Sequence, residues 1–481
     1  MELIFEKSVK GRRGVKLPDS DVPKAKKLDG KYLRKESPFL PEVSELDVVR
    51  HFTKLSQRNF SVDTNFYPLG SCTMKYNPKF TEEIARLPGF AELHPLMPQL
   101  GSGSGLVQGA LEVLYNIEEL LAEITGMKEV TTEPLAGAHG ELTGIMLIAA
   151  YHKHKKNKKK YIIVPDSSHG TNPASAAIAG YEIVSIPTAS DGCMDMDIYK
   201  SKLTDEVAAV MLTCPNTLGV FNTRIKEITD LAHQFDALMY YDGANLNAML
   251  GKCRPGDIGF DVVHLNLHKT FATPHGGGGP GAGPVGVNEK LVDFLPVPKV
   301  VKSKDGSFAL DENKPKSIGR IAPFYGNFGV ILKAYAYILL LGKDGLIKAS
   351  EGAVLNANYC LARLKDAYEL PYKRICMHEF VISASKQLQN GVRALDIAKF
   401  LIDNGMHPPT VYFPLVVKEA IMIEPTETES KETLDRFIDV MLEAARLAEN
   451  NPDVLKNAPT TMPVSRLDET KAARELNCSH I

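Results

Sequence analysis

Short apolar runs alternate with helical patterns across the middle of this chain. Each run is four to six residues long, which suits a buried strand, and helical patterns lie between several of them. This alternation favours an α/β fold in which helices cover a mostly parallel sheet. In open sheets of that kind, ligands gather beyond the carboxyl ends of the strands. The runs are residues 129–132, 161–164, 182–186, 208–212, 237–241 and 262–267.

The chain is longer than one ordinary domain, and its 481 residues predict three parts. Residues 1–60 are rich in charge and proline and are expected to form an extended N-terminal arm. Residues 61–330 carry the alternation of strands and helices and are expected to form a large domain. Two longer helical stretches, 328–341 and 351–370, and a mixed segment predict a smaller α+β C-terminal domain over residues 331–481.

Charge and cysteine content exclude several classes of protein. The net charge of −2 gives no global attraction to nucleic acid or to an anionic membrane. Seven scattered cysteines without a C-x-x-C pair indicate the reduced thiols of a cytoplasmic protein. The first residues resemble neither a secretory signal nor a transit peptide, and the longest apolar stretch, residues 334–341, is too short to span a bilayer. The expected partners are therefore small molecules or proteins, with no nucleic acid and no membrane.

Two of the strand-like runs end in an acid and in a lysine. The run 237–241 is followed by Asp242, and the run 262–267 by His268 and Lys269, after which a glycine-rich loop comes. Pyridoxal phosphate chemistry needs this pair, because a carboxylate keeps the pyridine nitrogen protonated while a lysine amine holds the cofactor aldehyde covalently. A strand-end lysine alone is more often an ordinary residue, and the Asp-Gly dipeptide also suits a turn. Together the two residues favour the cofactor.

Two loops that follow strands carry further candidate residues. Small residues lead into a helical pattern at residues 136–144 (AGAHGELTG), where backbone N–H groups and the helix dipole favour a phosphate. An ordinary helix entry would have the same pattern. Residues 166–173 (DSSHGTNP) offer hydroxyls and the imidazole of His169, which could stack on a flat ring. A helix capped by Ser or Asp, with Pro173 in its first turn, would explain the same string.

Three other motifs are set aside. The string GAGPVG at residues 281–286 fits a dinucleotide-binding pattern, but a strand is expected after it rather than before it. His264 and His268 have the spacing of a zinc-binding helix, but a strand is expected there, so no metal site is predicted. The basic run 153–160 is explained by an exposed helix end.

Several longer strings match those of one known family. They are residues 67–75 (YPLGSCTMK), 136–144, 169–173, 241–245 (YDGAN), 264–286, 324–327 (FYGN), 377–380 (MHEF) and 424–428 (EPTET). On these strings the chain resembles the P-proteins of the glycine cleavage system, and among them subunit 2 of the two-subunit glycine decarboxylase. The resemblance covers nearly the whole chain. One departure is Asn222, where an acid is usual in the family.

The resemblance implies a fold type I pyridoxal phosphate enzyme, with an aspartate aminotransferase-like large domain and a smaller C-terminal domain. It also implies roles for particular residues. Lys269 would hold the cofactor covalently, Asp242 would pair with its pyridine nitrogen, and His169 would stack on its ring. Ala138, His139 and Gly140 would hold the phosphate of the cofactor. Further cofactor contacts are expected from Thr171, Ala244 and His268.

For the reaction, the resemblance implies decarboxylation of glycine and transfer of the aminomethyl group to the lipoyl arm of the H-protein. It implies a companion, P-protein subunit 1, as a second protein partner. His94, Tyr325 and His378 lie in or near matching strings and are candidates for the lining of the site, although core or loop roles suit them equally. The arginines with no assigned role that could bind the substrate carboxylate are Arg320, Arg374 and Arg393.

Two alternatives stay open. The first is another fold type I enzyme that acts on amino acids, such as an aminotransferase or a desulfurase. The second is a non-catalytic scaffold subunit without cofactor, against which Lys269 and Asp242 argue.

Overall fold

The computed structural model describes residues 2–23, 26–100, 103–276 and 279–477. Its contacts divide the chain into two units, Met1–Ser61 and Val62–Ile481. In the first unit, helix α1 (Glu45–Ser56) begins at a capping box, which satisfies two backbone N–H groups at its start. The other elements of that unit are the short 3-10 turns η1 (Ile4–Lys7) and η2 (Gly30–Tyr32). The three-part division expected from the sequence stays a prediction.

A seven-stranded sheet, counted over the described residues, forms the centre of the second unit. Its strands are β1 (Glu129–Thr131), β2 (Tyr161–Pro165), β3 (Glu182–Ile186), β4 (Val207–Thr213), β5 (Leu238–Gly243), β6 (Val262–Leu265) and β7 (Val285–Val287). Their order is β1-β7-β6-β5-β4-β2-β3. Strands β2 to β6 pair in parallel, and β7 is antiparallel to both of its neighbours. The α/β class with a mostly parallel sheet, which the sequence predicts, is confirmed.

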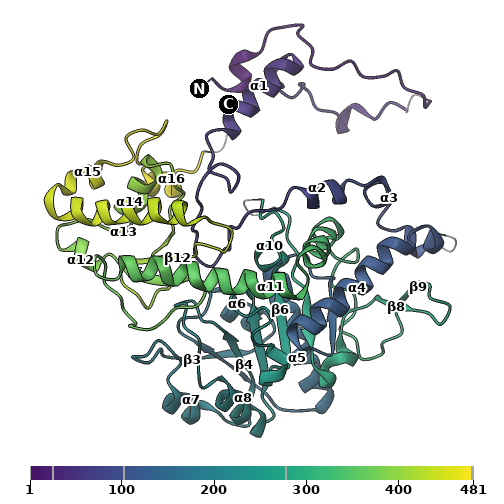
Figure 1. Ribbon diagram of the computed structural model, residues 1–481. Helices are drawn as coiled ribbons and strands as arrows, with labels where there is room; N and C mark the ends of the chain where they lie inside the picture. The colour runs from purple at the N-terminus through teal and green to yellow at the C-terminus, as the bar shows by residue number, and fades with distance from the viewer. Residues whose placement is uncertain (1, 24–25, 101–102, 277–278, 478–481) are drawn as a thin grey trace. The chain divides into compact units, whose positions relative to one another are not determined.

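Both faces of this sheet are buried, because side chains alternate across a strand and helices cover each side. In β5, Leu238 and Tyr240 belong to one apolar layer, and Met239 and Tyr241 belong to the other. Burial on two sides explains why the strands are nearly continuous apolar runs in the sequence. The helices are α5 (Gly137–Lys155) and α6 (Thr171–Ile178) in the first layer and α4 (Gln108–Thr125), α7 (Met196–Lys202) and α8 (Ile225–Gln234) in the second (Figure 1).

The C-terminal part of the second unit has its own core around a smaller sheet. This three-stranded antiparallel sheet has the order β10-β12-β11, with β10 (Phe380–Ser383), β11 (Thr410–Val411) and β12 (Ala420–Ile423). The helices α13 (Ala394–Asp403) and α14 (Lys431–Asn450) supply much of the rest of that core. The smaller α+β domain is therefore present, and Figure 1 shows its elements together in light green and yellow.

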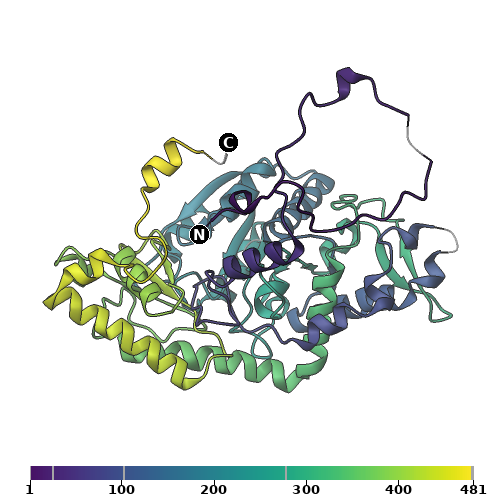
Figure 2. The same ribbon diagram turned by 90° about the horizontal axis from the view of Figure 1, so that it is seen from above.

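A long helical element, α11 (Phe328–Leu364), joins the two cores. It contacts α4 of the large domain and α14 of the C-terminal domain, and Figures 1 and 2 show it running between them. The sequence predicts two separate helices at 328–341 and 351–370. The structure also has two helical segments within α11, because Gly342 leaves the helical conformation, with a φ of 56° and a ψ of −170° that suit glycine best. The first segment ends at Leu341, as predicted, and the second continues to Leu364.

One boundary near the predicted site also differs from expectation. The run 262–267 predicts a strand up to the lysine, but β6 ends at Leu265, and Lys269 lies in the short helix α10 (Leu267–Thr270).

No helix in the described part of the chain is long and apolar enough to cross a membrane. The remaining elements are α2 (Phe80–Ala85), α3 (Pro88–Ala91), η3 (Met97–Gln99), η4 (Gly103–Leu106), α9 (Pro255–Ile258), η5 (Glu289–Phe294), β8 (Lys299–Lys302), β9 (Phe308–Asp311), α12 (Ser385–Leu388), α15 (Pro452–Asn457) and α16 (Glu469–Arg474).

A buried ion pair links the start of the second unit to its C-terminal domain. Lys75 Nζ lies 2.7 Å from Glu427 Oε1, and the two side chains are 0% and 10% exposed. The same ammonium donates to Asn247 Oδ1 at 3.0 Å and to the Tyr337 hydroxyl at 3.4 Å. Burial alone would lower the pKa of Lys75, but the charge of Glu427 raises it above its ordinary value. Lys75 therefore stays protonated although water is excluded.

Lys75→Met should destabilise the protein strongly, because it leaves the Glu427 carboxylate buried without its cation. We expect a loss of about 3 to 5 kcal/mol in the free energy of unfolding, measured by urea denaturation. The matched control is Lys79→Met. The side chain of Lys79 is 57% exposed, and that of its partner Asp63 is 52% exposed. That variant should lose no more than about 1 kcal/mol. Equal losses in the two variants would contradict the argument.

Candidate active site

Three polar side chains lie side by side at the carboxyl end of the central strands. Asp242 on β5 is opposite Thr213 on β4 and opposite His264 on β6 in the strand register. Parallel strands end at one edge of a sheet, so residues far apart in the sequence meet there. The acid that the sequence predicts as a strand-end residue is thus placed at the centre of this edge, and it is 4% exposed.

Both oxygens of the Asp242 carboxylate have partners. Asn172 Nδ2 and Thr213 Oγ1 donate to Oδ2 at 2.9 and 3.3 Å. The backbone N–H of Ala244 donates to Oδ1 at 3.1 Å, and His264 Nε2 lies 3.4 Å from the same oxygen. Burial alone would raise the pKa of Asp242, but these neighbours, above all His264, hold it below its ordinary value. The carboxylate is therefore anionic at neutral pH, as a partner of a protonated pyridine must be.

A second buried carboxyl group lies next to Asp242. Glu141 on α5 accepts from Asn172 Nδ2 at 3.0 Å and from Thr171 Oγ1 at 2.8 Å. Burial and the charge of Asp242 raise the pKa of Glu141 to about 7. Asn172 bridges the two groups, so one amide binds a permanent anion and a carboxyl group that titrates near neutrality.

Lys269 follows β6 directly and lies among the other candidate residues. Its charge acts on Asp242, His169, His264 and His268. The amine therefore lies within electrostatic range of all four groups. The structure thus brings together Lys269, Asp242, His169 and His268, which the sequence singles out.

His268 offers a neutral imidazole beside the lysine. Burial, the charge of Lys269 and the neighbouring His275 lower the pKa of His268 to about 4. Its Nδ1 atom is buried and has no hydrogen-bond partner within the described structure. A free, uncharged ring nitrogen in this place suits a hydrogen bond to a bound ligand.

The first turn of α5 forms a backbone cradle. A Cβ atom on Gly140 would lie 2.3 Å from the carbonyl oxygen of Gly283, and one on Gly283 would lie 2.1 Å from that of Ala136. Only glycine allows these two loops to approach so closely. No side chain caps the N–H groups at this helix start, and Ala138 is exposed there. The turn therefore presents free N–H donors and the positive end of a helix dipole, which suits an anion.

The other predicted contacts lie in neighbouring turns. His169 Nδ1 is 2.9 Å from Thr171 Oγ1 and accepts the Thr171 N–H at 3.3 Å, which fixes the orientation of the ring. Burial lowers the pKa of His169, so the imidazole is neutral. Helix α6 begins at Thr171, and its N-cap residue is Gly170 with no side-chain cap, so the alternative of a Ser or Asp cap is wrong. His139 Nδ1 accepts the N–H of Leu135 at 3.2 Å and so stabilises the cradle.

These groups fit pyridoxal phosphate. An anionic carboxylate, a lysine, a flat neutral imidazole and an uncapped helix start are the features that its ring nitrogen, aldehyde, ring face and phosphate require. The buried Nδ1 of His268, which lacks a partner among the described residues, is a further donor or acceptor for such a ligand.

Comparison with known proteins decides the family. The family model described as "Glycine cleavage system P-protein" matches residues 15–309, and that described as "Glycine dehydrogenase, C-terminal domain" matches residues 349–460. The chain belongs to the P-protein family. The first match includes Asp242 and Lys269, so the P-protein family assignment covers the candidate site itself.

Relatives and solved structures agree with membership of the P-protein family. "Probable glycine dehydrogenase (decarboxylating) subunit 2" of Listeria innocua is 56% identical over 479 residues, 99% of this chain and 97% of the relative. The protein of the same name from Chlorobaculum tepidum is 57% identical over 100% of this chain and 99% of the relative. An inhibitor-bound crystal structure of glycine decarboxylase (P-protein) has a TM-score of 0.69 at 19% identity, covering 86% of this chain and 91% of that one. A cysteine desulfurase from Thermococcus onnurineus has a TM-score of 0.61 at 17% identity over 79% and 95%. The last two likenesses show the fold, which is that of fold type I enzymes.

Sequence reasoning missed several residues of this P-protein family site. Asn172, Glu141, Thr213 and His264 all contribute to the environment of Asp242. From the sequence, His264 is weighed only as a metal ligand, and Thr213 is assigned no role. Their positions at strand ends could have identified both Thr213 and His264, because each lies at the strand end next to Asp242. Recognising this required the order and register of the strands.

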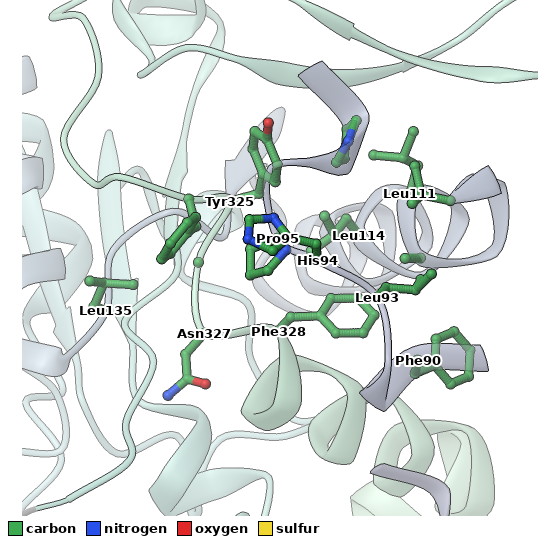
Figure 3. Close-up of a pocket in the computed structure, with 15 residues that line it drawn as sticks. Phe90, Leu93, His94, Pro95, Leu111, Leu114, Leu135, Tyr325, Asn327 and Phe328 are labelled. Atoms are coloured by element: carbon green, nitrogen blue, oxygen red, sulfur yellow. The ribbon is translucent and has the colours of Figure 1, made fainter. Parts of the chain in front are cut away.

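His94 and Tyr325 line an apolar cavity of about 430 Å³ rather than the strand ends. Figure 3 shows them with Leu111 on one side and Leu135 on the other. Leu135 directly precedes the α5 cradle, so the cavity adjoins the phosphate end of the candidate site. His378 is in a different place, within the electrostatic range of Lys269.

Glu141→Gln should remove part of the pH dependence of stability. The folded-state pKa of Glu141, about 7, is above the ordinary value of 4.5, so the folded state binds the proton more tightly. That stabilisation is present below pH 4.5 and is lost as the pH rises through about 7. Between these limits the wild-type free energy of unfolding should fall by on the order of 1 to 3 kcal/mol more than that of the variant. Urea unfolding at a series of pH values measures this, with the exposed Glu92→Gln as control. Identical pH profiles for all three proteins would contradict the raised pKa.

Proposed function

We propose that this chain is the cofactor-bearing subunit of a glycine decarboxylase of the glycine cleavage system. It removes the carboxylate of glycine as CO₂ and transfers the aminomethyl group to a lipoyl disulfide carried by the H-protein. The observation that carries the proposal is the buried, anionic Asp242 beside Lys269 at the carboxyl end of one sheet. Relatives named glycine dehydrogenase (decarboxylating) subunit 2 support it.

Particular residues would hold pyridoxal phosphate. When bound, the cofactor supplies an electron sink for the bonding pair that CO₂ leaves behind. Lys269 would hold its aldehyde covalently, Asp242 would keep its ring nitrogen protonated, and His169 would lie against its ring. The remaining contacts, from the α5 cradle and the adjoining turns, would come from Ala138, His139, Gly140, Thr171 and His268. The N–H of Ala244 would act on the ring nitrogen through Asp242, to which it donates.

The arginines support loss of the substrate carboxylate rather than its retention. Arg374 donates to the main-chain oxygen of Asp191, Arg320 pairs with Glu312, and Arg393 is exposed. An aminotransferase clamps the substrate carboxylate with a guanidinium group. A carboxylate without such a clamp is stabilised less in the ground state, and this favours its departure as CO₂.

The partners are a companion subunit and a lipoylated carrier. The relatives are named as subunit 2, which supports a companion, and a lipoyl arm is the acceptor that the aminomethyl group requires in the proposed reaction. Glycine is the proposed substrate. The cytoplasmic location stays a prediction.

The decisive measurement is exchange of labelled bicarbonate into the carboxyl group of glycine. The purified chain, loaded with cofactor, is assayed with lipoylated carrier, with and without the companion subunit. Lys269→Ala should lower the exchange rate by at least about 10²-fold, because it removes both the covalent attachment and the amine that moves protons. Lys252→Ala, which changes an exposed lysine paired with Glu351, is the control and should keep the wild-type rate.

Three other results would point elsewhere. No exchange in the complete mixture would overturn the proposal. Amino-group exchange with a keto acid, or release of sulfide from cysteine without carrier, would favour an aminotransferase or a desulfurase. Failure to take up cofactor at all would favour a scaffold subunit.

A further inference from the structure

Two buried glutamates face each other near Lys269, and the reaction described above gives them no role. Glu379 precedes β10 and Glu424 follows β12. Because Phe380 pairs with Ile423 in the antiparallel register, the next pair outward sets Glu379 opposite Glu424. The two side chains are 4% and 0% exposed. Like charges directly opposite on neighbouring strands repel each other, and burial strengthens the repulsion. This pair, the Glu379–Glu424 dyad, therefore holds one proton.

Hydrogen bonds indicate which glutamate carries that proton. Glu424 accepts from the N–H and the hydroxyl of Thr73 at 3.1 and 2.6 Å and from Asn245 Nδ2 at 2.9 Å. Glu379 has a single such contact among the described residues, from the N–H of Ser71 at 2.7 Å. Donors stabilise the ionised form of a carboxyl group. Glu424 is thus the carboxylate, and burial together with its charge raises the pKa of Glu379 well above the ordinary value.

The segment that supplies these donors is held tightly against the small sheet. Ser71 and Thr73 have φ values of 62° and 50°, which are uncommon outside glycine. A Cβ atom on Gly70 would lie 2.2 Å from Met422 Cγ on β12. The backbone is therefore fixed where its N–H groups meet the two carboxyl groups, so the unequal supply of donors is built into the fold.

His378 completes the cluster. It is 2% exposed, and both ring nitrogens lack a hydrogen-bond partner within the described structure. Its Nε2 lies 3.9 Å from Glu379 Oε1, and one atom from each of His378, Glu379 and Glu424 lies within 4.8 Å of the others. An imidazole with two free nitrogens can accept a proton on one side and pass it on from the other. The other titratable groups that act on the cluster are Lys269, Cys72 and Glu427.

We propose that the Glu379–Glu424 dyad stores one proton and delivers it, through His378, to the sulfur that is released during aminomethyl transfer. This inference rests on the proposed function. After CO₂ has left, the substrate methylene carbon forms a bond to one sulfur of the carrier's cyclic disulfide. The sulfur–sulfur bond breaks, the disulfide is reduced, and the electron pair goes to the second sulfur.

That second sulfur takes the proton and becomes a thiol. Glu379 loses the proton, which leaves two carboxylates opposite each other. Their repulsion drives the dyad to take a proton back from solvent before the next turnover. The proton that the sulfur takes therefore comes from this chain, and solvent replaces it before the next turnover.

Glu379→Gln tests the proposal with little change in shape. The amide has nearly the same shape as the protonated acid but has no proton to give. We expect unchanged cofactor loading and about a 10²-fold slower aminomethyl transfer, because a positioned acid contributes about that much. The remaining rate should rise about tenfold for each pH unit lowered, since hydronium then supplies the proton. Glu133→Gln, which changes a carboxyl group that is 3% exposed and lies elsewhere, is the matched control and should keep the wild-type rate and pH profile.

Infrared spectroscopy tests the stored proton without any turnover. At about pH 9, the buried acids with pKa values of about 7 or 8 are mostly ionised. A carboxylic-acid carbonyl band should remain in the wild type and in Glu133→Gln and should be lost in Glu379→Gln. A band that is absent from the wild type, or unchanged in Glu379→Gln, would overturn the proposal. So would a stoichiometric divalent cation that elemental analysis finds in the wild type and not in Glu379→Gln.

The outcomes separate the two hypotheses. If the wild type exchanges bicarbonate and Glu379→Gln matches Glu133→Gln in rate and pH profile, the proton delivery fails and the decarboxylase stands. If the wild type shows no exchange in the complete mixture, the proposed function fails and proton delivery fails with it, although the infrared band still reports whether the dyad shares a proton.

Discussion

The burial of one anionic carboxylate is the constraint on which the candidate site depends. An isolated carboxylate in the interior would take up a proton rather than stay charged. Asp242 stays charged because Asn172, Thr213 and His264 reach it from α6, β4 and β6. Each of these comes from a different segment, and they meet only because the strands are adjacent and parallel. The sheet therefore holds the Asp242 carboxylate in place and also keeps it ionised, because it brings the partners of that carboxylate together.

Buried carboxyl groups around Lys269 differ in charge for one physical reason, the supply of hydrogen-bond donors and cations. Asp242 has His264 and Lys269 near it as well as its donors and is ionised, whereas Glu141 has donors but lies beside the charge of Asp242, so its pKa rises to about 7. Glu379 has a single donor within the described chain and a carboxylate opposite, so its pKa is raised well above the ordinary value. The site thus contains a fixed anion on one side and an acid with a transferable proton on another. The charge of each group is set by its neighbours, so neither Asp242 nor Glu379 would keep its protonation state in the surroundings of the other.

The sequence predicts the large domain well because two-sided burial leaves a visible pattern. Runs such as 208–212 and 237–241 are apolar on both faces, so they mark strands directly, and the residues that follow them include Asp242. Partners of that acid could not be chosen in the same way. Thr213 and His264 become its neighbours only through strand order and register, which depend on contacts between distant segments. The pairing that sets Glu379 opposite Glu424 also depends on strand register, so it could not be predicted from the sequence.

The electrostatics near Lys269 bear on the choice between decarboxylation and amino-group transfer. The Glu379–Glu424 dyad carries one negative charge within the range of the lysine, and Arg374 is engaged with the Asp191 segment instead. A substrate carboxylate that enters this space meets an anion rather than a guanidinium clamp. Its ground state is raised by that repulsion, and loss of neutral CO₂ relieves it. The same dyad that supplies a proton at the end of the reaction thereby favours breaking the carboxyl bond at its start.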